Sequence, residues 1–245
     1  MKKFAILFAL FASIGLAQAE VGLVGTMDAG YSGIKAPGST TTTTSFQSGG
    51  MTTSYVGVTG SEDLGSGNRA FFELTSFLNN GTGATLGGTT ANTWARSAWV
   101  GLSDEKLGTV KMGRQSNPSF LPTILFNAYG DSGAYSPLWH ATYFGNTGNP
   151  MTQLYNDTAW DNSVAYETPS IAGAKVSLAN ARSNGKENNG ANVLYFAGDL
   201  GVTAYTQRTT VNSTGSFQND IFTTRGGAAV TGGVGGSYNL KVAKV

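Results

Sequence analysis

The sequence predicts an all-β fold, an antiparallel β-barrel that spans a membrane, and three observations support this prediction. Short segments in which apolar and polar residues alternate recur along the chain, and strict alternation is the period of a half-buried β-strand. Only 12% of the residues are charged and 35 are glycine, a composition typical of many strands joined by turns. The connections between these segments are alternately short and long, as they are in transmembrane barrels.

Residues 1–19 have the form of a secretory signal peptide. Lys2 and Lys3 make a short basic region, an apolar run follows, and Ala17-Gln18-Ala19 is a small-x-small cleavage site. We expect these residues to be removed and residues 20–245 to form the exported chain. No later apolar run reaches the roughly 18 residues that a spanning helix needs, so strands are expected to cross the membrane.

The composition argues against several kinds of site. The chain has no cysteine, so disulfide bonds do not stabilise the exported fold. It has one histidine, His140, and its acidic residues are too scattered to form a calcium or magnesium site. We therefore expect no metal and no cofactor. The near balance of 15 basic and 14 acidic residues gives no electrostatic reason to expect nucleic-acid binding.

Ten segments alternate clearly enough to be predicted as strands. The first, residues 20–31, is longer than the roughly 5 or 6 residues of an ordinary soluble strand and fits a tilted transmembrane strand. Residues 35–50, rich in Thr, Ser and Gly, are expected to form a solvated outer loop. Residues 242–245 are expected to begin an eleventh strand. The other nine predicted strands are residues 54–60, 69–75, 94–102, 109–114, 162–168, 174–181, 193–197, 202–208 and 228–238.

One register assigns apolar residues to one face of the predicted hairpins and polar residues to the other. The apolar, outward face is expected to hold Val56, Val58, Ala70, Phe72, Leu74, Ala98, Val100, Leu102, Val110, Met112, Val164, Tyr166, Val176 and Leu178. The residues expected to line a pore are Tyr55, Arg69, Glu73, Lys111 and Lys175.

The long segment of residues 115–160 keeps neither a strand nor a helix period. It contains four of the six prolines, Pro118, Pro122, Pro137 and Pro150, and many aromatic residues. Loops of more than about 12 to 15 residues are uncommon in compact domains and are usually functional or disordered. Because aromatic residues argue against disorder, we expect an ordered loop that is held inside or over the rest of the fold.

The motifs of this chain, in their order, resemble those of the Gram-negative general porins of the β-proteobacterial type. The resemblance covers residues 20–245. It rests on Gly-Val-Thr-Gly at 57–60, Ser-Glu-Asp-Leu-Gly at 61–65, Ala-Trp-Val-Gly-Leu at 98–102, Gly-Thr-Val-Lys-Met-Gly-Arg-Gln at 108–115 and Asn-Ser-Val-Ala-Tyr at 162–166.

The resemblance implies a sixteen-stranded barrel in the outer membrane, a homotrimer, and a water-filled channel for passive diffusion of small hydrophilic solutes and ions. It also implies that the third outer loop, residues 115–160, folds into the pore and constricts it. Opposed charges across such a gap tune ion selectivity. We expect Arg96, Arg114 and Asp131 at the constriction, with Arg96 carried over from the family pattern.

Two departures from the family pattern affect these expectations. Tyr55 and Ala165 stand where the family usually has inward basic residues, which weakens any inferred preference for anions. Family members end on a strand with a terminal aromatic residue, whereas this sequence ends at Lys244-Val245. We therefore expect the amino-terminal ten or eleven strands of a barrel, an incomplete or open sheet that does not conduct by itself, because unpaired edges are costly in lipid.

Two other functions fit single features of the sequence. A secreted or surface-exposed adhesin would explain the richness in Thr, Asn and Gly, but a passenger-type solenoid should show a repeat of roughly 20 to 30 residues, and none is seen. A hydrolase could use Ser136, His140 and Asp131, but triads are defined by geometry and no nucleophile elbow precedes a helix. The chain is predicted not to be an enzyme.

Glycine and aromatic residues each admit two interpretations. The glycine-rich residues 226–236 lack the Lys-Ser/Thr ending of a phosphate-binding loop, so we interpret them as part of a curved strand.

The aromatic residues near strand ends and in the long loop fit a girdle at the lipid headgroups, and a sugar-stacking track remains the alternative. They are Tyr31, Phe77, Trp94, Tyr143, Phe144, Trp160 and Tyr238.

Overall fold

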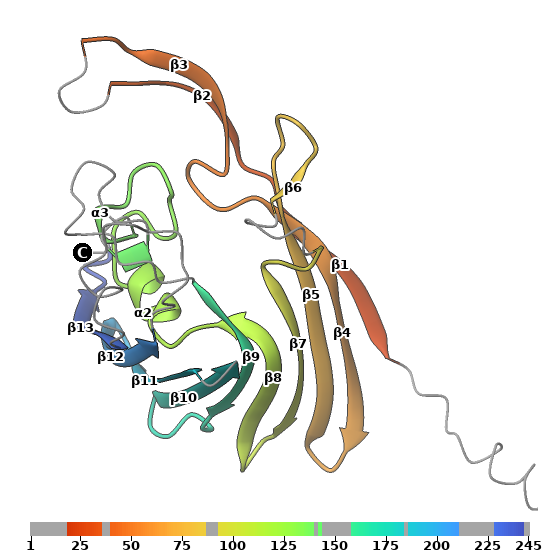
Figure 1. Cartoon of the computed structure of the whole chain (residues 1–245). Helices are drawn as coiled ribbons and strands as arrows, with labels where there is room; N and C mark the ends of the chain where they lie inside the picture. The colour runs from red at the N-terminus through yellow and green to blue at the C-terminus, as the bar shows by residue number, and fades with distance from the viewer. Residues whose placement is uncertain are drawn as a thin grey trace, which may run out of the picture.

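The computed structural model describes residues 19–35, 40–86, 93–139, 142–143, 158–183, 186–210 and 228–242. Nearly all of the predicted signal peptide and the final residues 243–245 lie outside this part of the chain. The described residues form one large antiparallel sheet that curves into a trough (Figure 1) and a separate two-stranded hairpin. The all-β prediction is therefore confirmed.

Ten strands follow one another across the large sheet in chain order, and a short eleventh, β6 (Thr85–Leu86), pairs with β5 alone. Within the described residues, β1 and β13 each have a strand neighbour on one side only, so this sheet is open, as predicted. The ten are β1 (Glu20–Thr26), β4 (Tyr55–Gly65), β5 (Asn68–Leu78), β7 (Ser97–Asp104), β8 (Gly108–Ser116), β9 (Ala159–Glu167), β10 (Ala174–Ser183), β11 (Lys186–Ala197), β12 (Leu200–Thr210) and β13 (Ala228–Tyr238).

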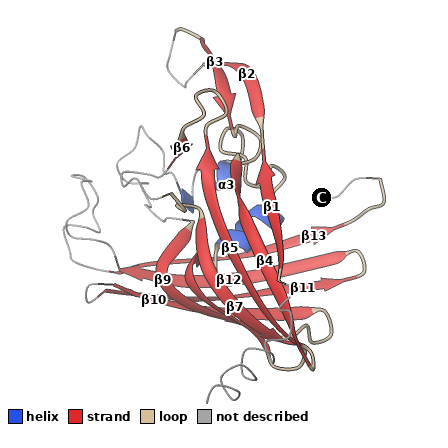
Figure 2. Cartoon of the chain, turned by 90° about the vertical axis from the view of Figure 1, so that its right-hand side faces the viewer, coloured by secondary structure: helices blue, strands red, loops and turns tan. Residues whose placement is uncertain are grey.

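Short turns join the strands at one end of the sheet, and the connections at the other end are longer (Figure 2), except that only residues 184–185 separate β10 from β11. The turn between β4 and β5 needs only Ser66 and Gly67, and Gly67 has a φ of 82°, a conformation that glycine adopts without steric cost. The turn before β10 uses Gly173 with a φ of 88° in the same way. Glycines therefore make the short turns that the sequence predicted.

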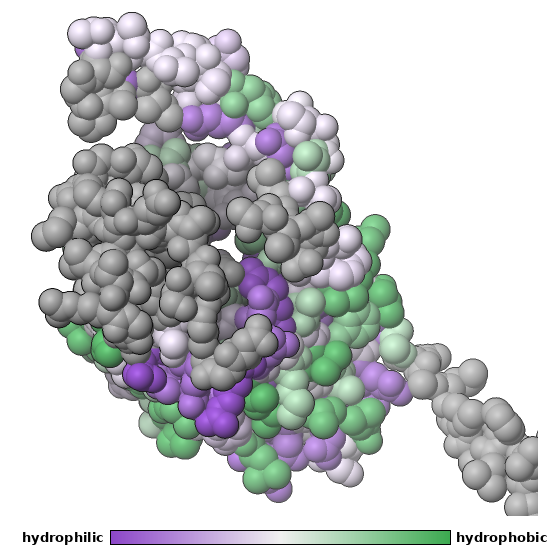
Figure 3. Space-filling model, in the orientation of Figure 1, coloured by the Kyte–Doolittle hydropathy of each residue, from purple (hydrophilic) through white to green (hydrophobic). Residues whose placement is uncertain are grey.

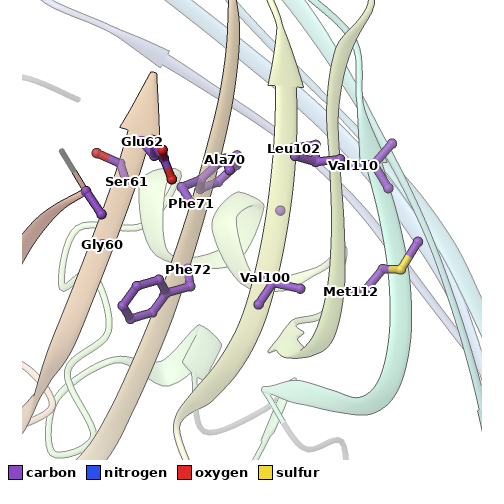
Figure 4. A pocket seen from close by; sticks show the side chains of 12 residues that line it. Gly60, Ser61, Glu62, Ala70, Phe71, Phe72, Val100, Leu102, Val110 and Met112 are labelled. Carbon is purple, nitrogen blue, oxygen red and sulfur yellow. The ribbon is translucent and has the colours of Figure 1, made fainter. Parts of the chain in front are cut away.

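The pairing of residues between neighbouring strands confirms that the predicted apolar residues share one face of the sheet. Val100 pairs with Met112 and Leu102 with Val110, and these side chains remain exposed, Val100 by 62% and Met112 by 54%. They line a shallow apolar groove on the outside of the trough (Figure 4), together with Phe72. Apolar side chains also gather on the molecular surface over β1 and β4 (Figure 3). Such a surface is expected to face lipid.

The inside of the trough has the opposite polarity. The largest fully buried side chains among the described residues are mostly polar, Gln207, Thr75 and Thr123 among them. None of the helices in the described part of the chain is long and apolar enough to cross a membrane. Apolar groups outside and polar groups inside invert the arrangement of a soluble protein, and a sheet around a polar interior has this arrangement.

The amino-terminal prediction was wrong in two respects. The predicted strand 20–31 is divided into β1 and β2 (Ala29–Ile34), and the predicted loop 35–50 contains β3 (Thr43–Ser48), which pairs with β2. The division occurs at Asp28, whose carboxylate accepts hydrogen bonds from the amides of Met51 and Thr52. The repeated threonines of the predicted loop are β-branched and favour a strand. The hairpin of β2 and β3 extends beyond the large sheet (Figure 2).

Several predicted strands were too short. β4 continues to Gly65 and β11 begins at Lys186, although their ends do not alternate clearly. Pairing explains both extensions, because Asp63 lies opposite Arg69 on β5, and Glu187 lies opposite Arg182 on β10. Neighbouring strands thus extend a ladder beyond the residues that the alternation marks.

A charge on the outer face should destabilise the membrane-embedded protein far more than the same charge on the inner face. Leu178 is 50% exposed on the outer face and pairs with Tyr166, whereas the next residue, Ala179, pairs with Ala165 and Gly190. We expect Leu178→Arg to lower the free energy of unfolding by about 2–4 kcal/mol. Ala179→Arg should lower it by less than about 1 kcal/mol, because it points into the polar interior. Urea unfolding in lipid vesicles measures both, and equal losses would contradict the assignment of faces.

Candidate functional site

The segment between β8 and β9 folds back over the concave face of the sheet (Figure 1). It was expected to lack regular structure, but it contains two short helices, α2 (Phe120–Leu125) and α3 (Pro137–Trp139). Aromatic contacts order it: the ring centroids of Phe120 and Trp139 lie 5.6 Å apart, and those of Trp139 and Tyr143 lie 4.7 Å apart. We refer to residues 117–143, of which His140 and Ala141 lie outside the described part, as the inner loop.

Buried polar side chains of β11 and β12 hold the start of the inner loop. Asn192 donates a hydrogen bond to the carbonyl oxygen of Pro118 at 2.7 Å, and the side-chain oxygen of Gln207 accepts one from the amide of Ser119 at 3.2 Å. The Ser119 hydroxyl lies 2.9 Å from that of Tyr143. Because these groups are shielded from water, their hydrogen bonds are costly to break.

An aromatic contact and a glycine hold the middle of the inner loop. Phe126 stacks on Phe196 of β11 with ring centroids 5.8 Å apart. A Cβ atom at Gly235 of β13 would lie 2.9 Å from the Cβ of Phe126, so only glycine leaves room for this contact. The glycine-rich run therefore continues in a strand, as predicted, and gives the loop space to approach the sheet.

The far part of the inner loop is fixed to the segment that precedes β4. One carboxylate oxygen of Asp131, Oδ2, accepts hydrogen bonds from the hydroxyl of Thr52 at 3.0 Å and from the amide of Thr53 at 3.1 Å. The Ser132 hydroxyl and the Ala134 amide both donate to the carbonyl oxygen of Gly50, at 2.8 and 3.2 Å. The loop is thus attached to two separate parts of the wall.

Three predicted site residues, Tyr55, Glu73 and Arg96, meet on the inner wall. Arg96 was predicted within a strand of residues 94–102, but β7 begins at Ser97, so Arg96 directly precedes it. The guanidinium of Arg96 lies 3.2 Å from the carboxylate of Glu73 and 3.8 Å from the centre of the Tyr55 ring. It also donates to the hydroxyl of Thr75 at 3.2 Å. The side chains of Arg96 and Glu73 are 27% and 24% exposed, so both groups are partly shielded yet still in contact with the interior.

Lys111 lies nearer the short turns on the same inner wall. Its ammonium is 5.2 Å from the centre of the Trp99 ring, within the range of a cation–π contact, and Trp99 meets Phe71 edge to face at 5.3 Å. A Cβ at Gly101 would lie 2.9 Å from the Phe71 ring and 3.0 Å from the Lys111 side chain. Within the described part of the chain, Lys111 has no carboxylate partner.

The other predicted residues lie apart from this cluster. Arg69 donates to the Ser61 hydroxyl at 2.6 Å, and Lys175 forms an ion pair with Glu167 at 3.0 Å, both near the short turns. Arg114 pairs with Asp161 at 2.8 Å, beside an irregularity in the ladder of β8 and β9. The assignments of Arg96, Arg114 and Asp131 to a constriction stay predictions.

Sequence reasoning did not identify Gln207 and Asn192 as site residues. Their only signal was a polar residue at an inner position of β11 or β12, and their loop partners are 88 and 74 residues away along the chain. Of the hydrolase candidates, the Ser136 hydroxyl donates to Asn127 and accepts from the Trp139 amide, Asp131 accepts from Thr52 and Thr53, and His140 lies outside the described residues. No group of three or more His, Cys, Asp or Glu side chains suited to a metal occurs among the described residues.

Loss of the Gln207 acceptor should loosen the inner loop. In Gln207→Leu the Ser119 amide loses its partner, and a net hydrogen bond is worth about 0.5–1.5 kcal/mol. We expect thermolysin to cleave residues 117–143 about three- to tenfold faster, as followed by mass spectrometry of the folded protein. Thr206→Leu, at an exposed position of the same strand, is the control and should be cleaved at nearly the original rate. Equal acceleration in both variants would show that the hydrogen bond does not hold the loop.

Comparison with known proteins supports the family suggested by the sequence. The family model described as Gram-negative porin matches residues 5–245. An outer membrane porin protein of Bordetella pertussis is 31% identical over 223 residues, which cover 84% of this chain and 55% of that protein. The chain therefore spans about half the length of this relative.

Solved structures show the same fold. An anion-selective porin from Comamonas acidovorans matches with a TM-score of 0.71 and 22% identity, over 93% of this chain and 66% of that one. Salmonella typhi OmpF, solved in complex with daunomycin, matches with a TM-score of 0.60 and 15% identity, over 91% of this chain and 62% of that one. With nearly the whole sequence matched by the family model, this chain belongs to the Gram-negative porins, a family of outer-membrane channels rather than enzymes.

Proposed function

We propose that this chain forms the wall and the constriction of a water-filled channel through which small hydrophilic solutes and ions diffuse passively. The observation that carries the proposal is the inner loop, which lies against the polar, concave face of a sheet whose convex face is apolar. A loop in this position narrows the space that the sheet surrounds. Shape and fixed charge then select among solutes without any covalent step.

The proposed selectivity depends on charges that face the interior. Glu73 balances much of the charge of Arg96, because the two groups are only 3.2 Å apart. Lys111 has no such partner among the described residues, so it contributes a less compensated positive charge. Ions that pass the inner wall would therefore experience a weak field at Arg96 and a stronger positive field at Lys111.

The proposed partners of the outer face are outer-membrane lipid and, in the full-length protein, two further copies in a homotrimer. Large apolar side chains remain exposed on this face, including Val100 at 62% and Val230 at 73%. Monomeric soluble proteins rarely expose wide apolar patches. Lipid and neighbouring subunits would both cover such a surface.

Planar-bilayer recording with the full-length gene product tests the channel directly. We expect stepwise increases in conductance as single molecules insert, because each step reports a water-filled path. The control is the same protein unfolded by heat, which should give no steps. Absence of stepwise conductance from correctly folded protein would contradict the proposed function.

Neutralising Glu73 should make the channel more permeable to anions. In Glu73→Gln the Arg96 charge is no longer balanced, and a unit charge about 5 Å from an ion contributes about 0.8 kcal/mol in water. We expect the chloride-to-potassium permeability ratio, obtained from the reversal potential in a salt gradient, to rise on the order of threefold. Glu167→Gln, which frees Lys175 near the short turns, should change the ratio less. An equal or opposite shift would exclude Arg96 and Glu73 from the narrow part.

A further inference from the structure

We infer that Asp131 is a positioning residue whose carboxylate oxygen fastens the inner loop to the wall, a role that does not depend on its negative charge. The inference rests on the proposed function only in treating the inner loop as a constriction. It differs from the expectation that Asp131 opposes arginines across the pore. The hydrogen bonds around its carboxylate support this role.

The Asp131 carboxylate is already engaged with the wall. Its Oδ2 accepts from the Thr52 hydroxyl and from the Thr53 amide. No Lys or Arg among the described residues forms an ion pair with it, whereas Arg96 and Arg114 are paired with Glu73 and Asp161 respectively. Asp131 therefore binds neutral donors of the wall, as an attachment point would.

Neighbouring residues reinforce the same attachment. Ser132 and Ala134 both donate to the carbonyl oxygen of Gly50. Together with the two bonds to Asp131, four hydrogen bonds join three residues of the loop, Asp131, Ser132 and Ala134, to a short segment of the wall, residues 50–53. We call this set of four hydrogen bonds the loop latch.

The wall segment is itself held in place, so it can act as a fixed support. The Asp28 carboxylate accepts from the amides of Met51 and Thr52, at 2.5 and 3.0 Å. The Ser54 hydroxyl donates to the Asp28 carbonyl oxygen at 3.1 Å, and the Asn80 side chain donates to that same oxygen at 3.0 Å. These contacts connect the segment to the end of β1 and to the region after β5.

The latch and the contacts at the start of the loop lie on different parts of the wall. Asn192 and Gln207 hold Pro118 and Ser119 at β11 and β12, while the latch lies before β4. The inner loop thus extends between two attachments. Release of the latch would free its far part while the contacts with β11 and β12 still hold its start, and the size of the opening would then fluctuate.

Two nearly isosteric variants separate attachment from charge. Asp131→Asn removes the charge but keeps an acceptor oxygen, whereas Asp131→Leu removes both. Thr52→Val removes only one donor of the latch, and Thr44→Val, at an exposed position in β3, is the matched control. Thr52→Val also keeps the test decisive if Asp131→Leu does not fold.

Hydrogen exchange of the full-length protein, folded in lipid, measures the latch without requiring conduction. We expect the amides of Thr53 and Ala134 to exchange about tenfold faster or more in Asp131→Leu, and several-fold faster in Thr52→Val. Asp131→Asn and Thr44→Val should remain within about twofold of the original rates. Unchanged exchange in both Asp131→Leu and Thr52→Val would overturn the inference.

Single-channel recording of the same variants provides the second measurement. Attachment predicts frequent brief current fluctuations in Asp131→Leu and a quiet channel in Asp131→Asn. Equally quiet currents in the two variants would show that the acceptor oxygen does not hold the loop and would overturn the inference. If exchange follows the prediction but no variant conducts, the latch stands and the proposed channel function fails.

Discussion

The alternation of side chains across a continuous backbone ladder is the constraint on which the rest of this structure depends. In lipid, each backbone N–H and C=O group needs a hydrogen-bond partner within the protein, so a crossing strand must pair with its neighbours along its length. That pairing sends successive side chains to opposite faces. Val100 and Met112 consequently lie outside, while Trp99 and Lys111 lie inside. The polar interior follows from the same rule.

A polar interior determines how a long loop can be held there. In a soluble core, apolar packing would fix such a segment, but here the wall offers amides, hydroxyls and glycines. The inner loop uses all three: Gln207 and Asn192 bind its backbone, Thr52 binds Asp131, and Gly235 makes room for Phe126. Hydrogen bonds that are shielded from water fix geometry well, which suits a segment whose position sets an opening.

The sequence predicted the features that depend on local pattern. Period-two alternation identified the ten strands and the shared face of Val100 and Leu102, and prolines and aromatic residues marked the inner loop. The β2–β3 hairpin was not predicted, because the division at Asp28 depends on amides more than 20 residues further along the chain. Of the candidate site, Arg96, Glu73 and Tyr55 were each named from the sequence, but their contact with one another was not predicted. Gln207 was missed because its loop partner is 88 residues away.

The most direct test of the account asks whether the inner loop lies in the conducting path. These 245 residues contain no cysteine, so Tyr129→Cys, at a loop position that is 52% exposed, introduces a reactive thiol at a chosen place in the loop. The measurement is single-channel conductance of the full-length protein before and after a bulky, charged thiol reagent, with Leu178→Cys on the outer face as the control. The account predicts a clear fall in conductance for Tyr129→Cys and no change for Leu178→Cys. Complete modification of Tyr129→Cys, verified by mass spectrometry, with unchanged conductance would contradict it.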